Sequence, residues 1–387
     1  MGRTLRIRPV AFAAAATTGA ALVLAGCGDD TGPDNGQNAL QPKGEYAKQI
    51  LDLTRPFFWI AVAVGIGVVA GTIFVAVRFR QKPGGEERMP HQTHGNTALE
   101  VGWTIVPALI LAVMAVPTVA TIFSLAEKPK GDVLNVTVEG RQWWWQFTYE
   151  DGSKIVTANE LHMQTGQPLL LTQTGPPLAT QSDSPTQQYN NGVLHSFWIP
   201  ELNGKKDIVP GRKQTNKFVT DRPGTYLGQC AEYCGSSHAN MRMRVIVHTP
   251  EDFAKWQASQ KLALSSDQLQ AGVNNQAYGC AGCHSFQVGV PGAVGPNLTK
   301  LADRDAFAGD IFEMNYDNLW RWIHNAPSMK PSGDLQGWMP DFSVAYGPPF
   351  PSPAMSEQEA QQIACFLLKN TASTPERAAE VSKGCPS

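Results

Sequence analysis

Two long uncharged stretches constrain the fold of this 387-residue chain most strongly. Phe57 to Val77 is a run of 21 residues without a charged side chain, and Val101 to Leu125 is a run of 25. Because about 20 apolar residues are enough to cross the hydrocarbon core of a bilayer, both runs can span it. The two prolines of the second run are tolerated in such a helix, with a kink. The sequence therefore predicts a transmembrane helical hairpin at 51–127, with helices at about 56–79 and 98–125.

The N-terminal segment resembles a bacterial export signal. Three arginines among the first eight residues precede an apolar, Ala-rich run that ends in Leu24-Ala25-Gly26-Cys27. This string resembles the lipobox of bacterial lipoproteins, in which the cysteine is lipidated and becomes the new N-terminus. An ordinary signal peptide or an additional membrane helix is the alternative. We predict a lipoprotein signal peptide at 1–27, lipidation of Cys27 and a flexible tether at 28–50.

The export signal sets the orientation of the hairpin. With the N-terminus outside, two spans return the chain to the outer face, so every later domain is exported. The loop between the spans carries Arg78, Arg80, Lys82 and Arg88, as expected of a cytoplasmic loop. The net charge of −2 gives no electrostatic footprint for nucleic acid. We predict a multi-pass protein of the bacterial plasma membrane with its folded domains on the outer, periplasmic or extracellular face.

The predicted secondary structure of the exported part changes from strands to helices near residue 250. Short strand-like runs separated by Gly and Pro, such as Leu169-Leu170-Leu171, predict an all-β sandwich or barrel over 128–250. Helical patterns follow, which predict a linker helix at 251–266, an all-α domain at 267–372 and a tail at 373–387. Ser266 is expected to cap the first helix of that domain, and Ser356 with Glu359 forms a capping box for the last one. The predicted fold class is thus multidomain.

Cys280-Ala281-Gly282-Cys283-His284 is the attachment sequence of a c-type haem. The two cysteines form thioethers to the porphyrin vinyl groups, and the adjacent histidine is an axial ligand of the iron. A thioredoxin-like redox pair is the rival interpretation, but no βαβ pattern surrounds these residues and the histidine would be unexplained. We therefore predict a covalent haem c on Cys280 and Cys283, with His284 as an axial ligand.

The sixth iron ligand must come from elsewhere in the chain. A Met thioether would raise the haem potential, and the candidates downstream are Met314, Met329, Met339 and Met355. Met339 lies in a Gly- and Pro-rich loop that can fold over the haem face, so we predict it as the ligand, with His324 as the alternative. Gly295-Pro296-Asn297-Leu298 resembles the loop of class I cytochromes c whose proline carbonyl accepts a hydrogen bond from the axial histidine, so Pro296 is expected to orient His284.

A second cluster of soft ligands lies in the β-rich segment, where Cys230 and Cys234 are followed by His238 and Met241. Thiolate and thioether select copper, and a second cysteine in one loop lets two thiolates bridge two copper ions. A second imidazole must come from another strand, where His195 follows an apolar approach. A Cys230–Cys234 disulfide and a structural zinc site are the alternatives. The other two histidines considered, His162 and His248, are expected to be ordinary strand-edge residues rather than metal ligands.

Cys365 and Cys385 are the last pair of cysteines. No metal motif surrounds them, and an exported chain meets an oxidising compartment. A disulfide that pins the tail onto the last helix is expected, with two free thiols as the alternative.

Five strings resemble subunit II of the haem–copper cytochrome c oxidases, within residues 50–256. They are Glu100 to Pro107, Gln142 to Trp145, His195 to Trp198, Lys206 to Arg212 and Gly228 to Met241. The C-terminal part resembles the class I cytochrome c domain that is fused to subunit II in some of these oxidases. The chain is identified on these strings as a member of that family in its lipoprotein form.

The resemblance implies that the β-domain is a cupredoxin sandwich that carries the binuclear copper centre CuA. The implied ligands are His195, Cys230, Cys234, His238 and Met241, with the backbone carbonyl of Glu232. In this family the Glu232 side chain reaches a Mg or Mn ion at the boundary with subunit I. The C-terminal domain is implied to be an all-α class I cytochrome c.

Other residues match functional positions of the family. Trp143 matches the aromatic residue through which electrons reach the copper, whereas Trp144 and Trp145 are expected to pack. Glu100 matches the acid at the mouth of a proton pathway into subunit I, with a solvated helix-end carboxylate as an equal alternative. Gly192 is a departure, because the family usually has there an acidic residue that helps to dock soluble cytochrome c. Docking of soluble cytochrome c on the sandwich would then be weakened or moved elsewhere. A cytochrome c domain tethered to the same chain would make that loss tolerable.

The expected function is a one-electron relay, since no nucleophile–base pair is apparent. Electrons from a cytochrome c or a quinol–cytochrome c reductase would pass through haem c and CuA to the haem a and copper centre of subunit I. There dioxygen is reduced to water and protons are translocated; subunit III is a further expected partner. A nitric oxide reductase that carries CuA, a copper-delivering lipoprotein and a stand-alone redox sensor are the alternatives.

Overall fold

The structure is a computed structural model that describes residues 37–80, 94–176, 192–261, 263–331, 339–345, 347 and 352–386. The predicted signal peptide at 1–27 and the lipidation of Cys27 lie outside these residues, and so does residue 338 beside the predicted haem ligand.

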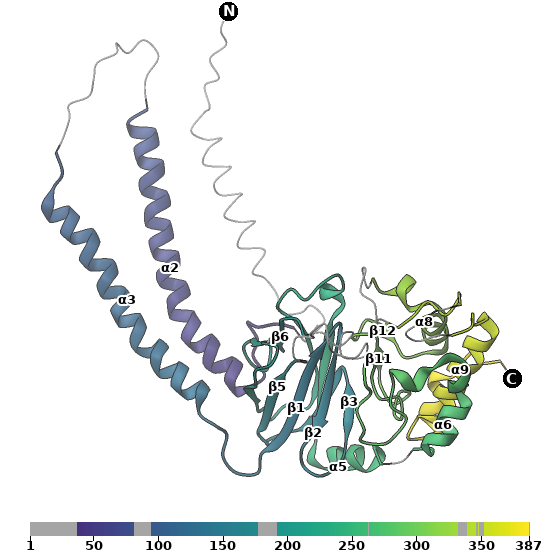
Figure 1. The fold of residues 1–387 in the computed structure, drawn as a ribbon. Helices are drawn as coiled ribbons and strands as arrows, with labels where there is room; N and C mark the ends of the chain where they lie inside the picture. Colours follow the sequence, from purple (N-terminus) through teal and green to yellow (C-terminus); the bar gives the residue numbers. More distant parts are fainter. Residues whose placement is uncertain are drawn as a thin grey trace, which may run out of the picture. The chain divides into compact units, whose positions relative to one another are not determined.

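Two long helices open the described part of the chain. α2 spans Glu45–Arg78 and α3 spans Thr97–Ala126, and both are long and apolar enough to cross a membrane (Figure 1). The side chain of Asn96 caps α3 by accepting hydrogen bonds from the N–H groups of Ala98 and Leu99. Both predicted spans are therefore helical.

Helix α2 begins at Glu45 rather than near residue 56, so the expectation of a flexible tether through residue 50 is wrong. Tyr46, Ala47 and Leu51 are buried. The N–H of Ala47 also donates a hydrogen bond of 3.3 Å to the carbonyl of Leu202 in the β-domain. Tertiary packing of the first turns orders a segment whose composition alone favours a tether.

Lys217 ties both long helices to the β-domain. Its Nζ donates hydrogen bonds to the carbonyls of Ser124 (2.9 Å) and Glu127 (2.7 Å) at the end of α3. The same group lies 4.4 Å from the ring centroid of Tyr46 in α2. Because the last carbonyls of a helix lack intrahelical partners, this cation caps α3.

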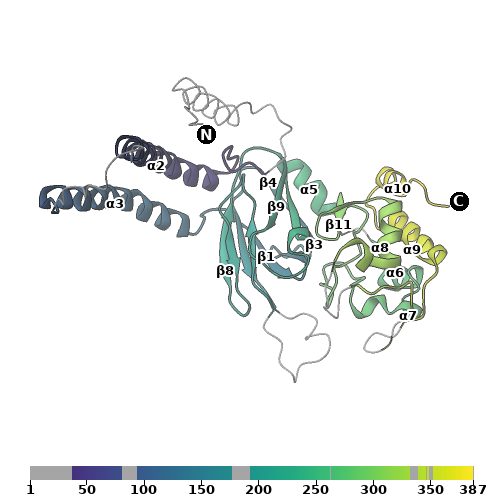
Figure 2. The ribbon, with the colours of Figure 1, turned by 90° about the horizontal axis from the view of Figure 1, so that it is seen from above.

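Residues 134–248 form two five-stranded sheets, with strand orders β3-β2-β1-β5-β8 and β4-β10-β9-β6-β7 (Figures 1 and 2). The strand bounds are β1 Leu134–Arg141, β2 Trp144–Tyr149, β3 Val156–Ala158, β4 Glu160–Gln164, β5 Leu169–Thr174, β6 His195–Trp198, β7 Lys206–Ile208, β8 Gln214–Phe218, β9 Gly224–Cys230 and β10 Arg242–His248. β1 pairs with β5, and β10 with β4, in parallel, whereas the other neighbouring strands are antiparallel.

The core of the sandwich follows from the alternation of side chains along the strands. In β1 the side chains of Leu134, Val136 and Val138 are buried, whereas Asn135 between them is exposed. Each such side chain contributes about 1.5–3 kcal/mol when fully buried. Trp145 lies in the same core, as its predicted packing role requires. The predicted all-β sandwich is therefore confirmed.

The C-terminal part is mainly helical. Its elements are α5 Pro250–Ser259, α6 Ser266–Gly272, α7 Asn275–Tyr278, the 3-10 turn Cys280–Gly282, α8 Tyr316–Met329, α9 Glu357–Asn370 and α10 Pro375–Val381. A short antiparallel pair, β11 Ala306–Phe307 and β12 Phe312–Glu313, means that the domain is not strictly all-α. The predicted capping box of Ser356 and Glu359 starts α9, whereas Ser265, not Ser266, caps α6.

The predicted disulfide between Cys365 of α9 and Cys385 is present. It closes a loop with a sequence separation of 20 residues and holds the segment that contains α10 against α9.

Helix α5 covers the edge strand β4 through stacked rings. The ring of Trp256 stacks on His162 with 4.1 Å between centroids, and His162 Nδ1 lies 2.8 Å from His248 Nε2. Burial lowers the pKa of His162 to about 3 and that of His248 to about 4. As predicted, both histidines lie at a sheet edge and outside the metal-ligand cluster, but a helix shields this edge from solvent.

Charged contacts join the sandwich to the helical domain. In β10, Arg244 Nε donates a hydrogen bond of 2.7 Å to Asp310, and its Nη1 lies 3.3 Å from Asp305. Glu160 Oε1 of β4 accepts a hydrogen bond of 2.8 Å from the N–H of Asp305. The loop at 303–310 is thus fixed on the sandwich.

Candidate metal centre and haem cavity

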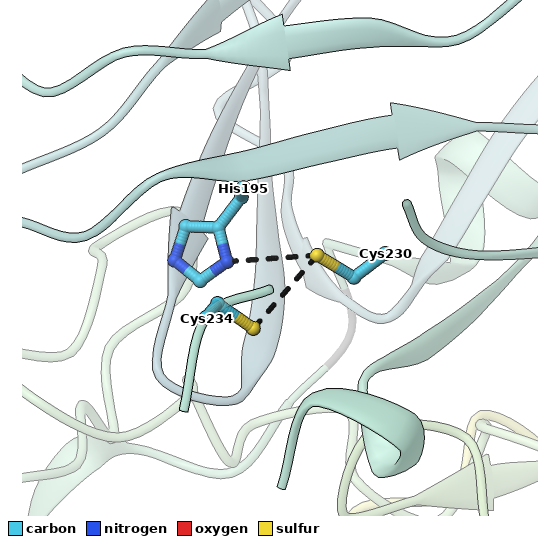
Figure 3. Close-up of side chains that lie close together, drawn as sticks. All are labelled: His195, Cys230 and Cys234. Atoms are coloured by element: carbon cyan, nitrogen blue, oxygen red, sulfur yellow. Dashed lines mark hydrogen bonds between the residues drawn. The ribbon is translucent and has the colours of Figure 1, made fainter. Parts of the chain in front are cut away.

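Strands β6 and β9 bring an imidazole and two thiols together at one end of the sandwich (Figure 3). His195 begins β6, Cys230 ends β9, and Cys234 lies in the following loop. Cys230 Sγ lies 3.9 Å from His195 Nδ1 and 3.8 Å from Cys234 Sγ. These three ligand atoms lie within 4.8 Å of one another, and all three residues are buried.

The same loop supplies two more of the predicted ligands. His238 Nδ1 lies 3.6 Å from Cys234 Sγ, and Met241 Sδ lies 3.8 Å from it. The carbonyl of Glu232 faces the centre, since Cys230 Sγ lies 3.2 Å from it. The structure thus gathers the complete predicted ligand set around the two sulfurs.

The pairing of β9 with β10 closes this ligand loop. The N–H of Cys230 donates to the carbonyl of Met241 at 2.9 Å, and the N–H of Ala231 donates to the carbonyl of Ser196 at 2.9 Å. Gly235 turns the loop with φ +113°, and a Cβ there would lie 2.9 Å from the Trp143 ring. Only glycine combines this φ with so close an approach.

The donor set fits copper. Cys230 and Cys234 are free, and their sulfur separation of 3.8 Å excludes the disulfide. The hydrogen bond with Cys234 lowers the pKa of Cys230 against the opposing effect of burial, and the same contact raises the pKa of Cys234. A thioether and a carbonyl beside two thiols suit a soft metal better than a structural zinc site.

A second candidate site is an open cavity with about 1230 Å³ of empty space, mouth included. Cys280, Cys283 and His284 line it, and both cysteines are free. His284 Nδ1 lies 2.8 Å from the carbonyl of Pro296, as predicted. A Cβ on Gly295 would lie 2.5 Å from the His284 ring, so the loop can approach the ring only with glycine there.

Met339 also lines this cavity, whereas His324 is not among its lining residues. His324 Nε2 instead lies 3.1 Å from the carbonyl of Met355. The remaining lining is largely apolar and includes Leu301, Phe307 and Ile323. An apolar cavity with two thiols, an imidazole and a thioether fits a covalent haem c.

Trp143 belongs to both sites. Its side chain is fully buried, its Nε1 donates a hydrogen bond of 2.9 Å to the carbonyl of Cys234, and it lines the cavity. Gln142 Nε2 donates to the same carbonyl at 2.7 Å. Trp144 lines the cavity too, with the Arg141 guanidinium 5.3 Å from its ring.

Two other predicted positions belong neither to the ligand cluster nor to the cavity lining. Glu100 is in the first turn of α3. Gly192 lies beside Pro176, and a Cβ there would overlap the Pro176 carbonyl, so an acidic side chain would need a different backbone path. Sequence reasoning missed Gln142 and Lys330, which both line the cavity. Gln142 stands beside the tryptophan run, but no sequence pattern marks Lys330.

Fold and site together define a membrane-anchored, cupredoxin-like protein with a buried sulfur–imidazole metal centre. Residues 134–249 match the family described as cytochrome c oxidase subunit II, periplasmic domain, and residues 35–121 match cytochrome c oxidase subunit II, transmembrane domain. The chain belongs to the cytochrome c oxidase subunit II family. It is therefore a subunit of a membrane oxidoreductase complex that includes subunit I, and its β-domain is exported.

Relatives extend along most of the chain. The cytochrome c oxidase subunit 2 of Alkalihalophilus pseudofirmus is 34% identical over 331 residues, which cover 83% of this chain and 90% of the relative. That of Bacillus sp. strain PS3 is 31% identical, with coverage of 82% and 89%. The quinol oxidase subunit 2 of Bacillus cereus is also 31% identical, with coverage of 61% and 75%.

Proposed function

We propose that this subunit receives electrons on a covalent haem c and passes them through a CuA centre to the haem a and copper centre of subunit I. There dioxygen would be reduced to water with proton translocation, so this chain supplies electrons rather than oxygen chemistry. The observation that carries the proposal is the position of Trp143. It lines the haem cavity and donates a hydrogen bond to the carbonyl of Cys234.

In this proposal the sandwich holds two copper ions. Cys230 and Cys234 would bridge them, with His195, His238, Met241 and the Glu232 carbonyl as the remaining ligands. A pair of thiolate-bridged copper ions supplies one-electron transfer with little change in geometry. The burial of His195 (1% exposed) and Met241 (0%) keeps water from the centre and opposes easy loss of metal, which disfavours a copper-delivery protein.

The helical domain is proposed to be a class I cytochrome c. Cys280 and Cys283 would bind the porphyrin, His284 and Met339 the iron, and Pro296 would orient His284. The match to the Alkalihalophilus relative supports a shared C-terminal domain, because 83% of the chain is more than the part that precedes residue 267. A haem held on the same chain also meets its acceptor at an effective concentration of the order of millimolar.

The net negative charge of the C-terminal domain supports an external donor that docks there through a surface different from the basic patch of a mitochondrial-type cytochrome c. Residues 261–387 carry 8 basic and 12 acidic side chains. The donor would be a cytochrome c or a quinol–cytochrome c reductase, and Gly192 in place of an acid is in keeping with a docking site away from the sandwich.

The remaining parts of the proposal concern the assembly. We place both long helices across the bacterial plasma membrane and a lipid on Cys27. Glu232 would reach a Mg or Mn ion facing subunit I, Glu100 would stand at a proton path, and subunit III would complete the complex.

The test uses the complex purified in detergent. Two coppers and one haem c per chain are expected, with the electron paramagnetic resonance signal of a mixed-valence copper pair. Cys230→Ser should abolish that signal and keep haem c, whereas the double variant Cys365→Ser/Cys385→Ser should keep both. Zinc in place of copper, or a single copper with an intact Cys230–Cys234 bond, would refute the proposal.

A further inference from the structure

Lys330 is a fully buried lysine at the junction of the two candidate redox sites. It follows α8, which is kinked at Asn325, a residue with non-helical dihedral angles, and contains Pro327. Its Nζ donates hydrogen bonds to the carbonyls of Trp143 (2.8 Å) and Ala308 (2.7 Å). The Lys330 side chain of the helical domain thus holds the backbone carbonyl of Trp143, which lies beside the metal loop.

The segment that Lys330 joins to Trp143 has an unusual backbone. Ala308, Gly309 and Asp310 all have positive φ, at 56°, 85° and 61°. Non-glycine residues rarely adopt this region, so the surrounding contacts must hold the strip in place. Lys330 binds the Ala308 carbonyl, the N–H of Arg242 donates 2.9 Å to the Gly309 carbonyl, and Arg244 pairs with Asp310.

Neighbouring groups pack closely around this strip. A Cβ on Gly309 would overlap the Asn240 carbonyl and would lie 2.7 Å from Lys330 Nζ and 3.1 Å from the Trp143 carbonyl. On the other flank, the hydroxyl of Ser237 in the metal loop donates to the carbonyl of Pro331. Lys330 therefore lies where the metal loop, the tryptophan and the haem cavity meet.

The contact does not require a fixed charge on Lys330. Burial lowers its pKa to about 7, and the nearby Cys234 opposes this shift. Both an ammonium and a neutral amine donate N–H groups to carbonyls, so the hydrogen bond to the Trp143 carbonyl persists in either form.

We propose that Lys330 is a positioning residue for electron transfer, which fixes Trp143 between the haem cavity and the copper ligands. This inference rests on the proposed function, in which electrons pass from haem c to CuA. Loss of this contact would let Trp143 shift relative to the two sites, and the electronic coupling between them would weaken.

The test compares Lys330→Met, which removes the donors, with Lys330→Arg, which keeps them, in the intact detergent-purified complex. Arg244→Met is the matched control, because Arg244 joins the same two domains without a contact to Trp143. Copper and haem content and the copper resonance spectrum are recorded first. Two readouts follow, namely hydrogen exchange of the segments 140–145 and 306–311, and the rate of copper reduction from photoreduced haem c.

Lys330→Met should speed exchange in both segments and slow copper reduction several-fold. Lys330→Arg should restore most of the rate, and Arg244→Met should leave exchange at 140–145 unchanged. The inference is overturned if Lys330→Met transfers electrons at the native rate, or if Arg244→Met slows transfer as much. A wild-type complex without haem-to-copper transfer would instead refute the proposed function.

Discussion

The indole Nε1 of Trp143 lies 2.9 Å from the carbonyl oxygen of Cys234, to which it donates a hydrogen bond. Trp143 also lines the cavity that holds the haem attachment sequence. A single aromatic side chain therefore spans the space between the haem cavity and a predicted copper ligand. Trp143 is fully buried, so a soluble donor has no direct access to it.

Trp143→Phe is expected to slow copper reduction by haem c several-fold while copper and haem content stay constant. Phenylalanine fills less of the site and lacks the N–H that reaches Cys234, a bond worth about 1 kcal/mol. Flash photoreduction of haem c measures the rate. Trp144→Phe is the control, since Trp144 lines the same cavity. An equal effect of both variants would contradict a special role for Trp143.

Local sequence patterns predicted most residues of the candidate site. Cys280 to His284 and Cys230 to Met241 are short segments, so their spacing alone indicates their chemistry. His195 is separated from Cys230 by 35 positions, yet it was predictable because the loop needs a second imidazole. The sandwich and the long helices follow from periodicity and length in the same way.

Contacts between distant segments could not be predicted from the sequence. Lys330 binds the carbonyl of a residue 187 positions away, and backbone carbonyls leave no mark in a sequence. The early start of α2 and the stack of Trp256 on His162 likewise depend on which surfaces meet. Tertiary packing decided these features, whereas local composition favoured a tether in place of the first turns of α2 and gave no sign of the stacked rings.

Met339→Ala is expected to lower the potential of haem c by on the order of 100 mV, because a thioether ligand favours the reduced iron. The sulfur-to-iron band in the near-infrared spectrum should vanish as well. A redox titration followed optically measures both. His324→Ala should change neither, because His324 contacts the carbonyl of Met355 instead. A band that survives in Met339→Ala would show that another residue is the ligand.

Cys385→Ser is expected to destabilise the cytochrome domain by about 3 kcal/mol, since the disulfide closes a loop of 20 residues in the unfolded chain. Guanidinium unfolding of the purified complex, followed at the haem absorption, measures this loss. The copper signal should persist at low denaturant, because neither cysteine belongs to the metal loop. Lys383→Ala, at an exposed position two residues earlier, is a control expected to leave the unfolding midpoint unchanged.

Glu160→Gln is expected to remove a loss of stability at high pH. Burial raises the pKa of Glu160 to about 7, Asp305 adds to this rise, and Arg244 opposes it. A carboxyl with a raised folded-state pKa binds protons more tightly in the folded chain, so its contribution to stability falls as pH rises from about 4.5 to 7. At pH 8 the variant should be more stable than the wild type by up to about 3 kcal/mol, and near pH 5 the difference should shrink.

Thermal unfolding of the full chain in detergent at pH 5 and pH 8 measures this difference. His162 and His248 have lowered pKa values, so they destabilise the fold as pH falls below about 6.5. His162 Nε2 lies 3.8 Å from Glu160 Oε2, so the comparison isolates Glu160 at pH 8, where both histidines are neutral in both proteins. Glu251→Gln, at an exposed position in α5, should reproduce the wild-type profile. A wild-type-like pH profile in Glu160→Gln would show that Glu160 stays ionised at the domain interface through its contacts with Arg244 and the Asp305 amide.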